Sequence, residues 1–471
     1  MEQNKNLKLN YRNTLYIGCA FFSILMLWQV YNHYCPLFLD YLLREHTNLK
    51  LVDNERLYII GIIMAADNLF AIFMLPIFGN LSDKTHTKFG RRMPYIIGGM
   101  ILSAIVFPLI PIMFMKDSLV GVIVMMGLIL IIMNIYRNPA VALMPDVTPK
   151  PLRSKANGII NFVGYLGAIL AGGLAMFLKI TDDSGTDWVP SKSGYTNAIL
   201  AFVIASIFMI IALVILVVKI KENSLVEQAK NELELGEKMA ETHGNVNEPL
   251  NKADRRNLII LLISTFLWFM SFNAIETYNS LFCKTVLGNE SIGGTIVIIL
   301  TISSIITFVL SVNLPAKIGR KKSVTLGLLF LIAGFAIILI TLLIAGVYKA
   351  DYSPSKTKIS IIPIYFAIIL CGIGWALINA SSYPMIVEMA NKENVGRFTG
   401  LYYTFSMAAQ TATPILVGLI MSLKTTGLRI LYIYSIILVI IALIVFSLFK
   451  ENRNKSKIEI KKGFEALDVD D

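Results

Sequence analysis

Three ionisable residues stand inside long apolar stretches of this 471-residue sequence: Asp67, Arg137 and Glu276. A charge at mid-bilayer costs roughly 2.5–3.5 kcal/mol on insertion scales, so such residues face a cavity or a partner. Burial favours the neutral form of a carboxyl group and a nearby cation favours the charged form, so either acid could exchange a proton. We expect these residues to couple an ion or to contact a ligand. A structural ion pair of Arg137 with Asp67 or Glu276 is the alternative.

Amide and indole side chains recur at helical spacing around these charges. The sets are Trp28 with Asn32, Asn134 with Arg137 and Asn138, Asn273 with Glu276, and Trp375 with Asn379. Residues three or four apart share a helix face. Rings that stack on CH groups, beside amides that bond hydroxyls, suit an uncharged, hydroxyl-rich ligand such as a sugar. Polar bonding between helices explains any single residue equally well. We favour a central cavity because there are four such sets.

The composition identifies the elements that must position these residues. Apolar residues make up 56% of the chain, charged residues only 15%, and the mean hydropathy is +0.67. Apolar runs of 18 or more residues recur along nearly the whole sequence, which is typical of a polytopic α-helical membrane protein. A β-barrel is excluded, because its strands are short and alternate apolar with polar residues.

The runs predict twelve transmembrane helices, each long enough to cross about 30 Å of hydrocarbon at 1.5 Å per residue. We place them at residues 14–39, 57–79, 95–115, 119–144, 155–178, 195–219, 256–283, 291–314, 323–347, 359–387, 396–422 and 426–450.

The basic residues predict the orientation. With the N-terminus inside, cytoplasmic segments carry 29 of the 42 Lys and Arg, outside loops carry 12, and Arg137 lies within a span. This excess predicts a multi-pass protein of the plasma membrane with both termini in the cytoplasm. The net charge of +11 sits in these loops, so we expect the lipid bilayer, and no nucleic acid, as a partner.

A polar segment from Lys219 to Arg256 divides the spans into six and six. We expect an N-terminal six-helix bundle at 1–219, a cytoplasmic linker at 220–255 with a helix near 227–241, a C-terminal bundle at 256–450 and a tail at 451–471. Spans 1 and 7, and spans 4 and 10, carry similar polar sets at similar depths. The likeness predicts two pseudo-symmetric bundles related by an axis along the membrane normal.

Charged residues at the predicted cytoplasmic ends suggest a gate. The block from Gly79 to Pro94 contains Asp83, Arg91 and Arg92, and Gly319 to Lys322 is a reduced copy of it. Asp146 and Glu388 lie at the cytoplasmic ends of spans 4 and 10. Their predicted partners, Arg153 and Arg397, lie at the starts of spans 5 and 11. These pairs can close an inner mouth in one state and break in another. Ordinary surface ion pairs, each worth about 0–1 kcal/mol, are the alternative.

Signatures of soluble catalysis do not occur. The sequence has no Walker A motif, HExxH, GxSxG or CxxC, so we expect no enzyme activity and no cofactor or metal. Cys19, Cys35, Cys283 and Cys371 lie singly within spans, and we interpret them as packing residues. His33 lies about 100° around its helix from Asn32, and we expect it to be a satisfied packing residue.

The chain resembles the major facilitator superfamily over essentially all its spans. The block at 79–92 is similar to the superfamily signature between spans 2 and 3, G-x-x-x-D…G-R-[RK], with a longer interval between Asp83 and Gly90. That longer form, followed by a proline, resembles the glycoside–pentoside–hexuronide:cation symporters and the sucrose transporters. Segments 137–146, 153–158 and 379–384 are similar to the sucrose-transporter branch.

The resemblance implies sugar uptake by alternating access, coupled to protons or, as the alternative, to sodium. It also implies that Asp83 latches the outward-facing state against a helix end of the other half. The region 129–133 is apolar where the sucrose carriers place an acid in span 4, and Asp67 stands alone where melibiose-type carriers have paired acids on span 2. We therefore assign coupling to Asp67, Glu276 and Arg137, and expect a monomer. A drug/proton antiporter of the same fold and a non-transporting membrane sensor remain as alternatives.

Overall fold

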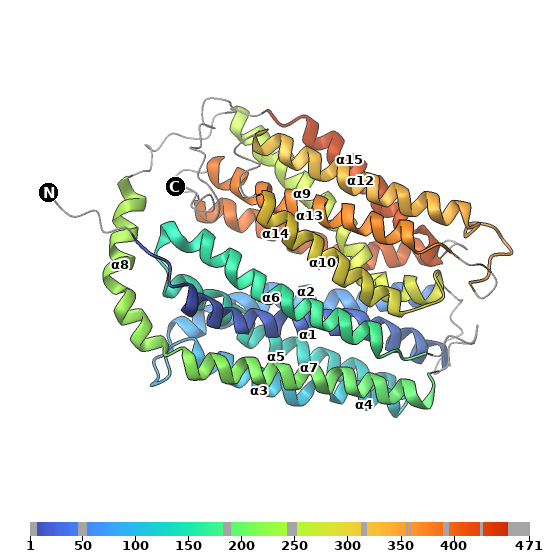
Figure 1. Ribbon diagram of the computed structural model, residues 1–471, viewed down its shortest axis with the longest axis horizontal. Coiled ribbons are helices and arrows are strands. Elements are labelled where there is room, and N and C mark those ends of the chain that lie inside the picture. The colour runs from blue at the N-terminus through green and yellow to red at the C-terminus, as the bar shows by residue number, and fades with distance from the viewer. Residues whose placement is uncertain are drawn as a thin grey trace.

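In the computed structural model the first half of the chain forms one group of helices (Figure 1). The structure describes residues 7–45, 54–181, 190–242, 252–311, 318–354, 357, 359–389, 395–423 and 427–450. The first group consists of α1 (Tyr11–Glu45), α2 (Glu55–Asp83), α3 (Met93–Val106), α4 (Leu109–Met115), α5 (Leu119–Asp146), η1 (Lys150–Leu152), α6 (Arg153–Phe177) and α7 (Lys192–Lys219).

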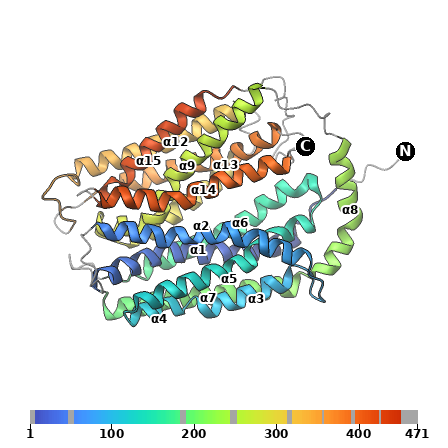
Figure 2. The same cartoon turned by 180° about the vertical axis from the view of Figure 1, so that it is seen from behind.

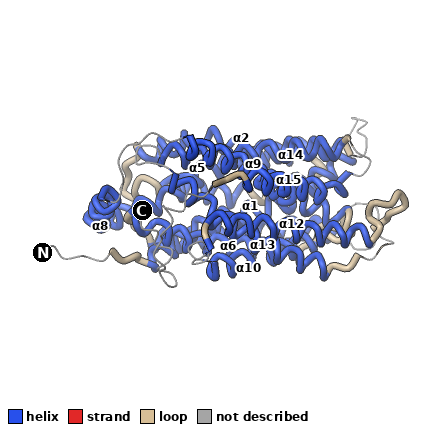
Figure 3. Tube along the Cα trace, turned by 90° about the horizontal axis from the view of Figure 1, so that it is seen from above, coloured by secondary structure: helices blue, strands red, loops and turns tan. Residues whose placement is uncertain are grey.

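The second half forms a matching group, drawn in yellow to red above the first in Figure 1. It consists of α9 (Lys252–Thr285), α10 (Ser291–Ser311), α12 (Arg320–Ile344), α13 (Ile362–Met389), α14 (Val395–Ser422), η2 (Gly427–Ile430) and α15 (Leu431–Ser447). In the sequence, α8 (Glu222–Thr242) stands between the two groups. In space it lies across one end of the helices, as Figures 2 and 3 also show. Among the described residues there is no β strand.

Twelve segments are long and apolar enough to cross a membrane, which confirms the predicted number. The third is built from α3 and α4, which Pro108 separates, because proline cannot donate the backbone hydrogen bond that would continue the helix. Large apolar side chains such as Phe73, Val120, Phe177 and Ile344 are exposed on the outside of the bundle. A helix satisfies all its own backbone groups, so this apolar exterior suits lipid.

Two ends of the bundle serve as reference points. We call the end that carries α8, Asp83, Asp146 and Lys219 the linker end, and the opposite end the far end. The two groups meet along α2 with α14, α6 with α10, and α1 with α9. The helices α5 and α13 are counterparts in the two halves, and their described residues do not pack along one another.

The groups approach one another most closely towards the far end. A Cβ atom at Gly61 of α2 would overlap the Pro414 carbonyl oxygen of α14, and one at Gly294 of α10 would lie 2.5 Å from the Gly172 oxygen of α6. The buried Tyr278 hydroxyl of α9 donates to the Leu57 oxygen at 2.8 Å and to the Pro414 oxygen at 3.1 Å. Small residues let backbones pack this tightly in membranes, so this conformation is closed at the far end.

Candidate functional site

A carboxylate joins the two halves near the middle of the bundle. Glu276 of α9 accepts a hydrogen bond from the Gln29 amide at 3.5 Å and from the Asn32 amide at 3.4 Å, both from α1. All three side chains are half-buried. These distances lie beyond the usual 2.7–3.2 Å of N–H···O bonds. The contacts are therefore weak enough for a ligand's polar groups to replace.

Aromatic side chains flank this bridge on both halves. The Trp375 ring of α13 stacks on Phe272 of α9 with centroids 3.8 Å apart and planes at 10°, and Phe269 meets it edge-on at 5.3 Å. On the first half, the Arg137 guanidinium lies 5.3 Å from the centroid of the Trp28 ring. Such faces attract CH groups and cations. The predicted aromatic residues thus sit on both α1 and α13.

The four predicted amides other than Asn32 divide into two pairs. Asn138 and Asn379 are half-buried, and the Asn379 amide donates to the Trp375 carbonyl oxygen of its own helix at 2.8 Å. Asn134 and Asn273 are buried, and Asn134 likewise donates to its own helix, to Leu130 O at 2.9 Å. The side-chain oxygens of Asn134 and Asn273 have no hydrogen-bond partner in the described part of the chain. These two amides are therefore less accessible to a ligand than the sequence pattern predicts.

The three intramembrane charges have different surroundings. In the described residues, Glu276 bonds to the two amides of α1 rather than to Arg137. Arg137 contacts Trp28. The backbone of Asp67 belongs to α2, but its side chain lies outside the described part of the structure. Arg137 and Glu276 therefore do not pair in this conformation, and the alternative of an ion pair between Arg137 and Asp67 stays a prediction.

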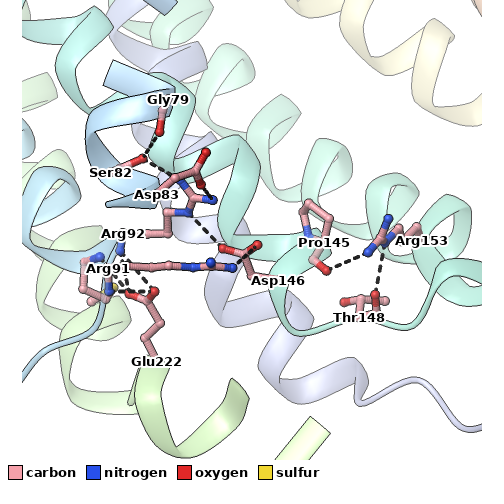
Figure 4. Close-up of polar contacts among 11 residues, drawn as sticks. Gly79, Ser82, Asp83, Arg91, Arg92, Pro145, Asp146, Thr148, Arg153 and Glu222 are labelled. Atoms are coloured by element: carbon pink, nitrogen blue, oxygen red, sulfur yellow. Dashed lines mark hydrogen bonds and ion pairs between the residues drawn. The ribbon is translucent and has the colours of Figure 1, made fainter. Parts of the chain in front are cut away.

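At the linker end, charged residues of the first half form one cluster (Figure 4). Asp146 at the end of α5 binds Arg91 Nη2 at 2.7 Å and Arg92 Nε at 2.9 Å. Arg92 also pairs with Asp83 and donates to the Ser82 hydroxyl. Burial would lower the pKa of Arg92, but Asp146 and Asp83 raise it overall. Charge-assisted bonds of this kind are roughly twice as strong as neutral ones.

Glu222, the first residue of α8, completes the cluster. Its carboxylate accepts the backbone N–H groups of Arg91, Arg92 and Met93 at 2.9–3.1 Å and is almost fully buried. These are the orphan donors at the start of α3, where a negative charge is favoured. Gly90 has φ of 118°, and a Cβ atom there would overlap Glu222 Oε2. Only glycine suits both this backbone angle and this contact.

Two predicted gate contacts differ from the structure. Arg153 does not pair with Asp146, because its guanidinium donates to the backbone oxygens of Thr148 at 3.2 Å and Pro145 at 3.1 Å (Figure 4). The Asp146 carboxylate binds Arg91 and Arg92 instead, so the predicted pair, which was expected in only one state of the gate, is not made in this conformation. Asp83 pairs within the first half and its side chain is 53% exposed, so the predicted latch against the other half is not made in this conformation.

The remaining gate predictions concern the second half. Arg397 is exposed at the start of α14, and the side chain of Glu388 lies outside the described residues, so their pairing stays a prediction. In the reduced copy of the signature, Gly319 precedes α12. Lys321 donates to the backbone oxygens of Ser447, the last residue of α15, and of Phe449. This loop therefore fastens α12 to α15 within the second half.

Three polar residues that bond to distant parts of the chain, Gln29, Glu222 and Glu290, were not predicted from the sequence. Gln29 lies three residues before Asn32 on the same helix face, and that spacing could have revealed it. Glu222 and Glu290 bind backbone groups more than 100 residues away, and no local pattern predicts such partners. His33 was predicted to be satisfied, yet neither ring nitrogen has a hydrogen-bond partner among the described residues.

Replacing Glu222 with alanine should lower the stability of the first half. The change would leave three backbone N–H groups at the start of α3 without an acceptor, at a cost of about 3 kcal/mol. Thermal unfolding of the purified protein in detergent should show a lower midpoint than the parent. Glu227 is exposed on the same helix, and Glu227→Ala should leave the midpoint unchanged. Equal midpoints for Glu222→Ala and the parent would contradict the role assigned to Glu222.

Twelve membrane-crossing helices in two matching groups, with a half-buried polar site where the groups meet, define a membrane transporter of the major facilitator fold. The sequence matches the family described as MFS/sugar transport protein over residues 17–423, and the chain belongs to that family. Among curated proteins no sequence match was found.

Solved transporters share this fold at low sequence identity. The peptide transporter POT in complex with sulfate has a TM-score of 0.64 and 15% identity, with 93% of each chain covered. A bacterial homologue of the iron transporter ferroportin, in an inward-facing state, has a TM-score of 0.61 and 14% identity, covering 94% of this chain and 99% of that one. A point mutant of the nucleoside transporter NupG has a TM-score of 0.60 and 13% identity, covering 93% and 100%. At these identities the likeness concerns the fold alone.

Proposed function

We propose that this transporter moves a sugar or glycoside across the plasma membrane by alternating access, driven by proton symport. The observation that carries the proposal is the contact of Glu276 with Gln29 and Asn32, which places an ionisable group of one half against amides of the other. Both ligand binding and the relative position of the halves change the surroundings of a carboxyl group at this junction, and therefore its protonation. One proton moving through 100 mV supplies about 2.3 kcal/mol.

The surroundings of Glu276 support a hydroxyl-rich ligand. The Gln29 and Asn32 amides, the Glu276 carboxylate and the stacked Phe272–Trp375 pair, with Phe272 one turn before Glu276 on α9, offer hydrogen-bond partners and an apolar plate in one region. Sugars present hydroxyl groups and CH faces to such a set. We assign ligand contacts to Trp28, Asn32, Asn138, Trp375 and Asn379, and coupling to Glu276 with Asp67 and Arg137.

The conformation fits one stage of a transport cycle. The halves are closed at the far end, and the excess of Lys and Arg favours a cytoplasmic linker end. In this orientation the site would open to the cytoplasm. The cluster of Arg91, Arg92 and Asp146 then belongs to the intracellular gate region, with Asp83, Arg153, Glu388 and Arg397 as the other assigned gate residues.

Uptake into vesicles tests the proposal. Purified protein in proteoliposomes would be given labelled disaccharides and glycosides under an imposed pH gradient, a sodium gradient or neither, with a dipeptide and a nucleoside as competing substrate classes. We expect accumulation of a sugar that depends on the pH gradient. Accumulation driven only by sodium would overturn proton coupling, and transport restricted to the peptide or nucleoside would overturn the sugar assignment.

A further inference from the structure

A second carboxylate joins the two halves, at the far end. Glu290 stands between α9 and α10 of the second half and is 1% exposed. Its carboxylate accepts the backbone N–H of Ile180 and, at 3.4 Å, that of Thr181, and it accepts the Thr181 hydroxyl at 3.2 Å. Both partners follow α6 in the first half. The three bonds therefore cross from one half to the other.

Neighbouring groups reinforce this junction. The Lys284 ammonium, near the end of α9, donates to the Thr181 hydroxyl oxygen and lies near Glu290. Three residues beyond Glu290, Gly293 begins the tight contact of α10 with the first half, which Gly294 and Gly172 continue. In the part of the chain that the structure describes, the ionisable groups that interact with Glu290 are Lys284 from α9 and Tyr34 from α1.

Behind the junction lies a polar group that the closed state leaves unsatisfied. His33 of α1 is 5% exposed, and neither ring nitrogen has a partner among the described residues. A Cβ atom at Gly293 would lie 3.2 Å from its Cε1 atom, so α10 covers the ring directly. A buried polar group without a partner costs free energy. Opening the far end would hydrate His33, so the closed state needs compensating contacts.

We propose that Glu290, bound to Ile180 and Thr181, is the latch that holds the far end closed, an inference that rests on the alternating access of the proposed function. Separation of α6 from α10 breaks all three bonds at once. The bonds are shielded from water, which makes them stronger than surface contacts. The latch therefore sets the ratio of far-end-closed to far-end-open molecules.

The latch also predicts a pH dependence. Burial raises the pKa of Glu290, although the Ile180 N–H, the Lys284 ammonium and the Thr181 groups lower it. In the open state the carboxyl group is hydrated and returns towards its ordinary value of 4.5. A group whose pKa is raised in one state stabilises that state at low pH. Glu290 should thus favour the closed state most at a pH below its ordinary pKa. This stabilisation of the closed state should be lost as the pH rises through the raised pKa of the closed state.

Distance measurement between spin labels tests the latch. Lys116 of the first half and Ala350 of the second are both exposed at the far end, and their cysteine variants would be labelled in a Cys19→Ser background in lipid vesicles. In Glu290→Ala we expect the ratio of long to short distances to rise about tenfold, the equivalent of one lost buried hydrogen bond. Glu290→Gln keeps an acceptor oxygen and should stay closed without the pH dependence. Glu45→Ala, at an exposed site of the same end, is the matched control.

A distance distribution of Glu290→Ala that coincides with the parent's at every pH would overturn the latch. Should that variant fail to fold, Thr181→Val removes the hydroxyl shared with Glu290 and Lys284, and it should raise the long-distance fraction less strongly. If the distance distribution of Thr181→Val coincided with that of the parent, the latch would likewise be overturned. The readout needs no substrate, so far-end opening without uptake of any tested sugar would contradict the proposed substrate and leave the latch in place.

Discussion

Glu276→Gln should abolish concentrative uptake while substrate exchange across the membrane continues. A glutamine keeps an oxygen that accepts the Gln29 and Asn32 amides but cannot gain or lose a proton. Coupled to one proton, a gradient of one pH unit sustains about tenfold accumulation of the substrate. In the variant the inside-to-outside ratio should fall to one. Counterflow of labelled against unlabelled sugar should persist, because it needs binding and conformational change without net proton movement.

Two comparisons sharpen this experiment. Gln29→Ala removes one amide from the bridge and retains the acid, so it should weaken apparent affinity and keep accumulation. Glu45→Gln changes an exposed glutamate outside the site and should behave as the parent. If Glu276→Gln concentrated sugar as well as the parent under the same pH gradient, coupling would have to lie elsewhere, with Asp67 as the next residue to replace.

Arg92→Ala should impair both folding and transport more than any other change in the linker-end cluster. Arg92 is 5% exposed and contacts Asp83, Asp146 and Ser82 at once. Breaking a buried charge pair by removing one partner typically costs about 3–5 kcal/mol. We expect a lower thermal midpoint in detergent, and lower uptake per folded molecule than in the parent, because the cation shared by Asp83 and Asp146 is lost from the gate region.

Arg92→Lys separates charge from geometry in this cluster. Lysine keeps the positive charge but cannot reach two carboxylates with a rigid planar fork. Stability should recover in part, while transport should remain impaired if the cluster acts as a gate. Lys88→Ala, an exposed basic residue of the same loop, should match the parent in both measurements. Normal uptake by a stable Arg92→Ala protein would remove the cluster from the transport mechanism.

The fold could be predicted because each helix must cross lipid on its own. The length of the apolar runs and the position of the charged residues determine the number of spans. The absence of alternating apolar and polar residues determines the helical class, and neither step needs knowledge of tertiary contacts. The twelve predicted spans and the family resemblance are confirmed. The span from residue 93 to 115 is not one continuous helix, because Pro108 divides it into α3 and α4.

The candidate site could be predicted only in part. Asn32 and Glu276 were identified because polar residues in apolar helices are conspicuous, and their pairing across the halves was not foreseen. Asp146 was paired with Arg153 because they are close in sequence, yet the bends after α2 and α5 bring Arg91 and Arg92 nearer. The Asn134 amide donates to a carbonyl oxygen of its own helix, and no sequence pattern distinguishes this role from ligand binding. Such choices depend on tertiary geometry.

The bonds from Glu222 to the start of α3 shorten the effective tether between the two halves. Glu222 holds the start of α8 on the first half, Gly236 of α8 packs against Pro149, and ten peptide bonds separate the end of α8 at Thr242 from the start of α9 at Lys252. Ten peptide steps reach at most about 35 Å when fully extended. Covalent geometry thus sets an upper limit on the separation of Thr242 and Lys252, and with it on how far the two halves can part at the linker end.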